Sequence, residues 1–223
     1  MSEAKSLSRR QALYTGMMGG MALAGMALPT RAAVPKAAVL NDQDYADVKR
    51  VQEYLNGIRS VESRFDQVAA DGGTASGTFY LSRPGKMRIN YDPPVPVTIV
   101  ADGWAVYYWD KSLQQLSQIG VEDTPAWFLL RDTIRLGGDV TLTRFERSPG
   151  IFRLTLLQTE KPDIGSLTMV LTDHPLALRQ WTVIDAQKRP ITVTLIDPHF
   201  DINLNPDLFV WVDPRRGFLG TPR

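Results

Sequence analysis

The feature that most constrains the fold is a two-residue hydrophobic period that recurs along most of the chain after residue 60. Within residues 86–91, Met87, Ile89 and Tyr91 alternate with polar side chains. This alternation is typical of a strand with one buried face. Further strands are predicted at 61–69, 76–82, 95–101, 104–110, 113–119, 139–147, 150–158, 167–171, 176–185, 191–195, 200–204 and 207–212.

Only two segments carry a helical period, so little helix is available to cover the strands. Residues 42–59 place their apolar side chains on one stripe, and Asn41 or Asp42 can cap the first turn. Thr124, followed by a proline, predicts the start of a short helix over 126–136. Since no long helix separates consecutive strands, we expect antiparallel pairing rather than parallel crossovers.

The predicted fold is therefore mainly β, with about ten or eleven antiparallel strands whose apolar faces must be covered. Two packed sheets, as in a sandwich, would bury these faces. A strongly curved sheet wrapped around its helices would also bury them, and it could leave an apolar hollow. The residues alone leave both arrangements open, with a filled core as the default.

Composition argues against several kinds of site. The 223 residues include no cysteine, which excludes disulfides, thiolate catalysis and Cys-ligated metal centres. His174 and His199 are the only histidines, too few for a multi-histidine metal centre and poor support for a catalytic triad. The chain also lacks a Walker-type phosphate loop and a Gly-x-Ser-x-Gly elbow. We therefore expect no cofactor, no metal site and no catalytic residue.

Residues 1–33 are predicted to be a cleaved export signal. Arg9 and Arg10 precede a weakly apolar, glycine-rich run that is short for a membrane span. The small residues Thr30 and Ala32 fit cleavage after Ala32. The paired arginines resemble a twin-arginine signal, with a general secretory signal as the alternative. Either route predicts a periplasmic protein without a membrane anchor.

The remaining chain is nearly neutral and reads as one domain. Without residues 1–32, it holds 21 basic and 23 acidic residues, so no basic surface for nucleic acid is expected. We expect a flexible lead-in at 34–41, a single domain at 42–217 and a C-terminal tail at 218–223.

Six pieces of sequence occur in an order that matches a known family. The most recognisable is 77–91, which reads as a strand, an Arg-Pro turn at Arg83 and a return strand. The others are the first helix, an aromatic-then-Gln strand at 61–67, Asp102-Gly103 with 107–110, Thr124-Pro125 with 128–130, and 209–214. Together, over about residues 45–217, they resemble the LolA family of periplasmic lipoprotein carriers.

The resemblance implies an unclosed antiparallel β-barrel of about eleven strands with a lid of short helices, and hence a hollow. It implies acylated lipoproteins as cargo, an inner-membrane ABC-type lipoprotein-releasing complex as loading partner, and an outer-membrane receptor where one exists. The carrier would be a monomer that binds no nucleic acid and has no enzymatic activity. The alternatives are the same fold binding free lipid or glycolipid, a lipoprotein-sensing module, or a secreted hydrolase.

The resemblance also assigns site residues. Arg83 would be the lid residue, with its guanidinium bonded to backbone carbonyls of the helical lid; an ordinary turn arginine is the alternative. The predicted lining of the cavity is one strand face, with two further aromatic residues as second-rank candidates. These residues are Phe79, Leu81, Met87, Ile89 and Tyr91, then Trp109 and Phe128.

Overall fold

The computed structural model describes residues 35–125 and 127–215. The predicted export signal at 1–33 and tail at 218–223 lie outside these residues, so both remain predictions. No helix among the described residues is long and apolar enough to cross a membrane.

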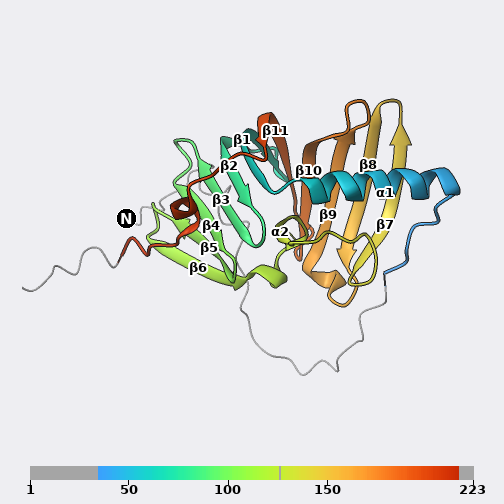
Figure 1. Cartoon of the computed structure of the whole chain (residues 1–223). Coiled ribbons are helices and arrows are strands. Elements are labelled where there is room, and N and C mark those ends of the chain that lie inside the picture. The colour runs from blue at the N-terminus through green and yellow to red at the C-terminus, as the bar shows by residue number, and fades with distance from the viewer. Residues whose placement is uncertain (1–34, 126, 216–223) are drawn as a thin grey trace, which may run out of the picture.

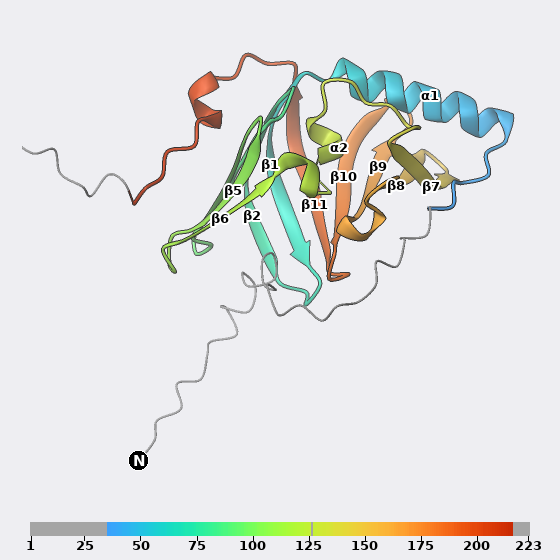
Figure 2. The same ribbon diagram turned by 90° about the horizontal axis from the view of Figure 1, so that it is seen from below.

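Eleven antiparallel strands form one strongly curved sheet around two α-helices (Figures 1 and 2). The prediction of an unclosed antiparallel barrel is confirmed. The strand order is β6-β5-β4-β3-β2-β1-β11-β10-β9-β8-β7. The strands are β1 (Ser60–Ala69), β2 (Thr74–Ser82), β3 (Lys86–Tyr91), β4 (Val97–Asp102), β5 (Ala105–Asp110), β6 (Gln115–Gly120), β7 (Val140–Ser148), β8 (Ile151–Gln158), β9 (Gly165–Thr172), β10 (Ala177–Asp185) and β11 (Pro190–Phe200).

The connection between β6 and β7 has to cross the open side of the barrel. These strands are consecutive in the chain, yet they form the two opposite edges of the sheet. The connection contains η2 (Val121–Asp123), α2 (Trp127–Leu130) and a loop at 131–139. Figure 2 shows α2 inside the curve of the sheet. We call residues 121–125 and 127–139 the lid.

β1 and β11, the first and last strands along the sequence, pair with each other in the middle of the sheet and join its two halves. β1 pairs with β11 along most of its length, from Val61 opposite Phe200 to Ala69 opposite Ile191. On either side of this seam, each strand pairs with its neighbour in sequence. The sheet therefore consists of two meanders, β1–β6 and β7–β11, connected by one long-range pairing.

The first helix, α1 (Asp42–Gly57), begins where the sequence predicts. The Asn41 side chain accepts a hydrogen bond from the Asp44 amide, and the Asp44 carboxylate accepts one from the Asn41 amide, which makes a capping box. Val51 and Leu55 of its apolar stripe are fully buried, whereas Tyr45 in the first turn is exposed. α1 lies across β7–β10 at one end of the barrel (Figure 1).

Three predicted elements differ in the structure. The helix expected over 126–136 is helical only at Trp127–Leu130, because the backbone of the following loop bonds to side chains of α1 instead. The strand expected at 207–212 is a 3-10 helix, η4 (Pro206–Phe209), capped by Asn205. The strand expected at 200–204 does not form, because β11 ends at Phe200 and the next residue, Asp201, takes a positive φ of 54°.

Asp47 is a buried carboxylate that fixes α1 to the sheet. It accepts hydrogen bonds from Arg50 (2.9 Å) and Gln43 (3.5 Å) and forms an ion pair with Arg147 of β7. Arg50 also bonds Asp173, in the turn between β9 and β10, at 2.9 Å. Burial raises the pKa of Asp47, but these hydrogen bonds outweigh burial and hold the pKa below its usual value.

We expect Asp47→Asn to lower the free energy of unfolding by about 2 kcal/mol at pH 7, because the charged hydrogen bonds are lost. A carboxyl with a depressed pKa stabilises the fold above its unfolded value of about 4, and this contribution disappears as the pH falls. The difference between variant and wild type should therefore shrink in acid. Urea unfolding of wild type and variant, at pH 7 and at a pH below about 4, measures this difference.

The matched control for this prediction is Glu53→Gln, on the same helix. The Glu53 side chain is 65% exposed and meets Lys49 at 3.9 Å, so its loss should change stability by less than about 0.5 kcal/mol. Equal losses in the two variants, or a loss at Asp47 that persists in acid, would contradict the anchoring role.

Candidate functional site

The concave face of the sheet brings together five of the predicted lining residues. Phe79 lies opposite Ile89, and Leu81 lies opposite Met87, in the β2–β3 hairpin. Tyr91 lies on the same face and donates a hydrogen bond to Gln67 Oε1 at 2.7 Å. The register places every second residue of both strands on the same face of the sheet. These side chains therefore form one apolar surface.

This surface continues across the whole barrel. The Phe79 and Trp181 rings, from the two meanders, lie with centroids 5.2 Å apart. Phe65 of β1 meets Tyr91 edge-on at 5.5 Å. A Cβ at Gly77 would lie 2.2 Å from the backbone oxygen of Asn90 and 2.8 Å from the Phe65 ring, so only glycine fits here. The buried concave-face residues of the second meander include Leu142, Phe152, Leu154, Leu156, Leu167, Met169, Leu171, Leu178, Val193 and Leu195.

Trp109 is not part of this surface, contrary to our expectation. It lies opposite Thr98, whereas the concave position on β5 is held by Tyr108, opposite Ile99. The outer face around Trp109 is covered by the C-terminal segment. There the Trp211 ring stacks on Tyr107 at 5.1 Å. Figure 2 shows η4 on the side of the sheet away from α2.

The lid fills the concave face with its own apolar side chains. Phe128, predicted as a lining residue, lies in α2 and is 2% exposed. Leu129 and Leu130 are also buried, and Ile134 of the loop is fully buried. Phe128 therefore belongs to the lid rather than to the sheet. The interior is packed in this structure and is not the open hollow that the family resemblance implies.

Arg83 holds the lid from the end of β2. Its guanidinium donates to the backbone oxygens of Leu129 (2.8 Å), Ile58 (3.1 Å) and Leu55. Next to it, the Gly85 amide donates to the Leu130 oxygen at 2.7 Å. These acceptors belong to α2, to the end of α1 and to the residue that follows α1. One side chain therefore connects both helical parts to the sheet.

Burial changes the electrostatics of Arg83 without removing its charge. Only 8% of the residue is exposed. Burial, reinforced by the positive charge of Arg59, lowers the pKa of Arg83 to about 10. The guanidinium therefore remains charged at neutral pH, and backbone carbonyl dipoles, rather than a contacting carboxylate, stabilise that charge. Because one of these carbonyls belongs to Leu129 of α2, the stabilisation of the Arg83 charge depends on the position of the lid.

Further contacts hold the lid loop on α1, and sequence reasoning did not find them. Asn56 donates to the Ile134 oxygen (2.9 Å) and accepts from the Ile134 amide (2.8 Å). The Gln52 Oε1 accepts from the Leu136 amide at 2.8 Å. Arg59 bonds both the backbone oxygen and the carboxylate of Asp132.

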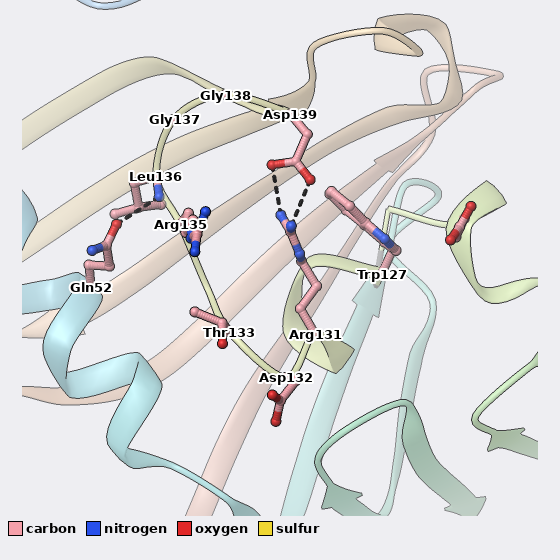
Figure 3. A pocket seen from close by; sticks show the side chains of 11 residues that line it. Gln52, Trp127, Arg131, Asp132, Thr133, Arg135, Leu136, Gly137, Gly138 and Asp139 are labelled. Atoms are coloured by element: carbon pink, nitrogen blue, oxygen red, sulfur yellow. Dashed lines mark hydrogen bonds and ion pairs between the residues drawn. The ribbon is translucent and has the colours of Figure 1, made fainter.

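A large open pocket lies outside the lid (Figure 3). Its volume is about 1060 Å³, and its wall is mostly polar. The residues that line it include Gln52, Glu122, Trp127, Arg131, Asp132, Arg135 and Asp139. An apolar crevice of about 20 Å³ lies between α2 and β7–β9. Trp127 lines both spaces.

The site is thus a curved apolar sheet face closed by a lid of its own chain, an arrangement that defines a carrier-type open barrel. The family model described as "Outer membrane lipoprotein carrier protein LolA" matches residues 56–212. The chain therefore belongs to the LolA family.

Individual relatives are distant. An outer-membrane lipoprotein carrier protein of Cupriavidus necator is 33% identical over 95 residues, which are 39% of this chain and 45% of that protein. Another from Methylococcus capsulatus is 30% identical over 131 residues, which are 55% of this chain and 62% of that protein. The chain thus spans about half the length of the curated relatives it matches.

A solved structure, of a DUF1329 family protein from Desulfovibrio piger, aligns over 74% of this chain and 95% of that chain. The TM-score is 0.46 and the sequence identity is 11%.

We expect Arg83→Leu to loosen the lid while the sheet stays folded. The variant leaves three carbonyl oxygens without their charged donor, which costs about 1–3 kcal/mol for each buried group left unpaired. Hydrogen exchange should accelerate in residues 127–136 and remain unchanged in β9 and β10. The control is Arg88→Leu, which removes an arginine bonded to the Leu208 oxygen on the outer face. Unchanged exchange in the lid of Arg83→Leu would contradict the holding role.

Proposed function

We propose that this protein is a periplasmic carrier that shields the acyl chains of lipoproteins and moves them from the inner to the outer membrane. The observation that carries this proposal is the lid: its buried apolar side chains occupy the concave face, and polar contacts such as those of Arg83 fix its position. Family membership supports lipoproteins as the cargo class. The proposed activity is binding and release, without catalysis.

The free energy of acyl burial sets the size of the task. Exposing about 15 methylenes to water costs about 12 kcal/mol, at about 0.8 kcal/mol each. A carrier must supply comparable apolar contact. Here the buried sheet face supplies it once Phe128, Leu129 and Leu130 move away, because these side chains cover the same surface.

The contacts of Arg83 suit a lid that must open. Hydrogen bonds to a charged group contribute about 1.5–3 kcal/mol each, less in total than one acyl chain gains by burial. The contacts of Asn56, Gln52 and Arg59 add to closure. We infer that the acyl chain replaces the lid side chains on the sheet, and that Arg83 loses its carbonyl partners when this happens.

The proposed location and partners follow from the sequence and the family. Residues 1–33 would direct export, with cleavage near Ala32, by the twin-arginine or the general secretory route. Because the sequence has no Walker-type motif, loading would need an energy source outside the chain. An ABC-type complex of the inner membrane would supply it, and an outer-membrane receptor would accept the cargo from a monomeric carrier.

Native mass spectrometry of the protein purified from its own periplasm tests the cargo. We expect complexes whose extra mass equals that of a mature acylated lipoprotein. We expect these complexes to be lost after a detergent wash, because detergent competes for the acyl chains. A co-purifying free lipid or glycolipid would replace lipoprotein as the cargo. Protein that carries neither, under conditions where lipoproteins are abundant, would contradict the proposal.

Two neighbouring residues on β3 provide a sharper test of the binding face. Ile89 points to the concave face and Asn90 to the outer face, where it accepts a hydrogen bond from Arg88. Ile89→Asp should weaken lipopeptide binding at least tenfold, a change of about 1.4 kcal/mol, because it places a carboxylate among methylenes. Asn90→Asp should bind normally. Circular dichroism checks folding, and equal affinities would place binding elsewhere.

A further inference from the structure

The apolar crevice beneath α2 lies at an edge of the sheet that has no strand neighbour. Its wall includes Val140 of β7, Leu156 of β8 and Leu167 of β9. Phe128 of α2 forms part of the opposite wall. Since β7 is an edge strand, this border can open without breaking hydrogen bonds between strands.

Trp127 lines both this crevice and the polar pocket outside, and Figure 3 shows its side chain in the wall of the polar pocket. The Arg131 guanidinium lies over its ring, 4.5 Å from the centroid. Arg131 also makes two bonds to the Asp139 carboxylate, at 2.6 and 3.1 Å. Asp139 is the last residue of the lid and directly precedes β7, so this pair holds Trp127 and Arg131 next to the edge strand. We call Trp127, Arg131 and Asp139 the clasp.

A second tether borders the same crevice. The Gln158 Nε2, at the end of β8, donates to the Glu122 oxygen of η2 at 2.8 Å. Close by, Lys161 pairs with Asp123 at 2.8 Å. These contacts hold η2 against the second meander. The crevice mouth therefore lies between two polar attachments of the lid, and Trp127 is the apolar ring between them.

We propose that the crevice behind Trp127 is the entrance for an acyl chain and that the clasp controls it. When Arg131 leaves the ring, Trp127 turns away and the first methylenes pack on Phe128, Leu156 and Leu167. The outer pocket, with both arginines and carboxylates in its wall, holds the polar end of the ligand. This inference rests on the proposed function, because it assumes a ligand with an acyl chain and a polar end.

The exposure of the clasp suits a part that opens often. The side chains of Arg131 and Asp139 are 21% and 51% exposed, so solvent weakens their ion pair. The Trp127 ring is partly exposed, and a cation over a ring that water reaches is likewise a weak contact. The more deeply buried contacts of Arg83 then yield after the chain has entered.

The first test measures the rate at which a dansyl-labelled triacyl lipopeptide binds the full mature protein. Trp127→Ala should bind and release it several-fold faster than wild type, because the ring no longer closes the crevice. Arg131→Gln, which keeps the ring, should change both rates in the same direction. Trp104→Ala is the control, since Trp104 is 88% exposed and outside the crevice. Wild-type rates in both clasp variants would overturn the proposal.

The second test uses the absence of cysteine in the chain, which makes single-cysteine variants specific. Ile164 lies at the crevice and is partly exposed, whereas Gln187 lies in the exposed turn between β10 and β11. Unlabelled triacyl lipopeptide should slow maleimide alkylation of Ile164→Cys and leave Gln187→Cys unaffected.

The outcomes separate the two proposals. Lipopeptide that binds wild type but does not protect Ile164→Cys, with unchanged rates in the clasp variants, overturns the entrance and leaves the carrier function standing. Wild-type protein that binds no lipopeptide overturns both. Protection of Ile164→Cys together with faster exchange in the clasp variants supports the entrance.

Discussion

The unpaired edges of the sheet are the constraint on which the rest of the structure depends. Because β6 and β7 are consecutive in the chain but lie at opposite edges, their connection has to cross the concave side. An apolar sheet face and a covalently attached cover thus come from the same topology. The barrel needs no separate domain as a lid, and neither edge strand can move far without affecting it.

The lid combines apolar side chains with polar attachments of different burial. Phe128 and Ile134 contribute non-directional apolar contact that another apolar molecule can replace. Arg83, deep in the structure, and Arg131, near its surface, contribute directional contacts that hold only one lid position. This division allows a closed form to be well defined while the surface beneath it remains able to accept a different occupant.

Local pattern predicted the sheet, its antiparallel pairing and the β2–β3 face, because a tight hairpin links Phe79 and Met87 in a fixed register. Trp109 was misplaced because β5 is apolar on both faces: Tyr108 faces the lid and Trp109 faces the C-terminal segment. The loop after Leu130 was misread as helix, since its hydrogen-bond partners on α1 are distant in sequence. A single sequence does not show which face of a two-sided apolar strand is concave, nor which distant side chains a loop will contact.

The seam between β1 and β11 has a consequence for how the chain acquires its shape. Each meander consists of hairpins between adjacent strands, which form through short loops. The seam joins residues from opposite ends of the domain, so closing it carries the largest loop entropy. It cannot form until β11 has left the ribosome. Pairing of the two halves therefore has to wait for the synthesis of β11, and until then the side of β1 that meets β11 is an exposed strand edge.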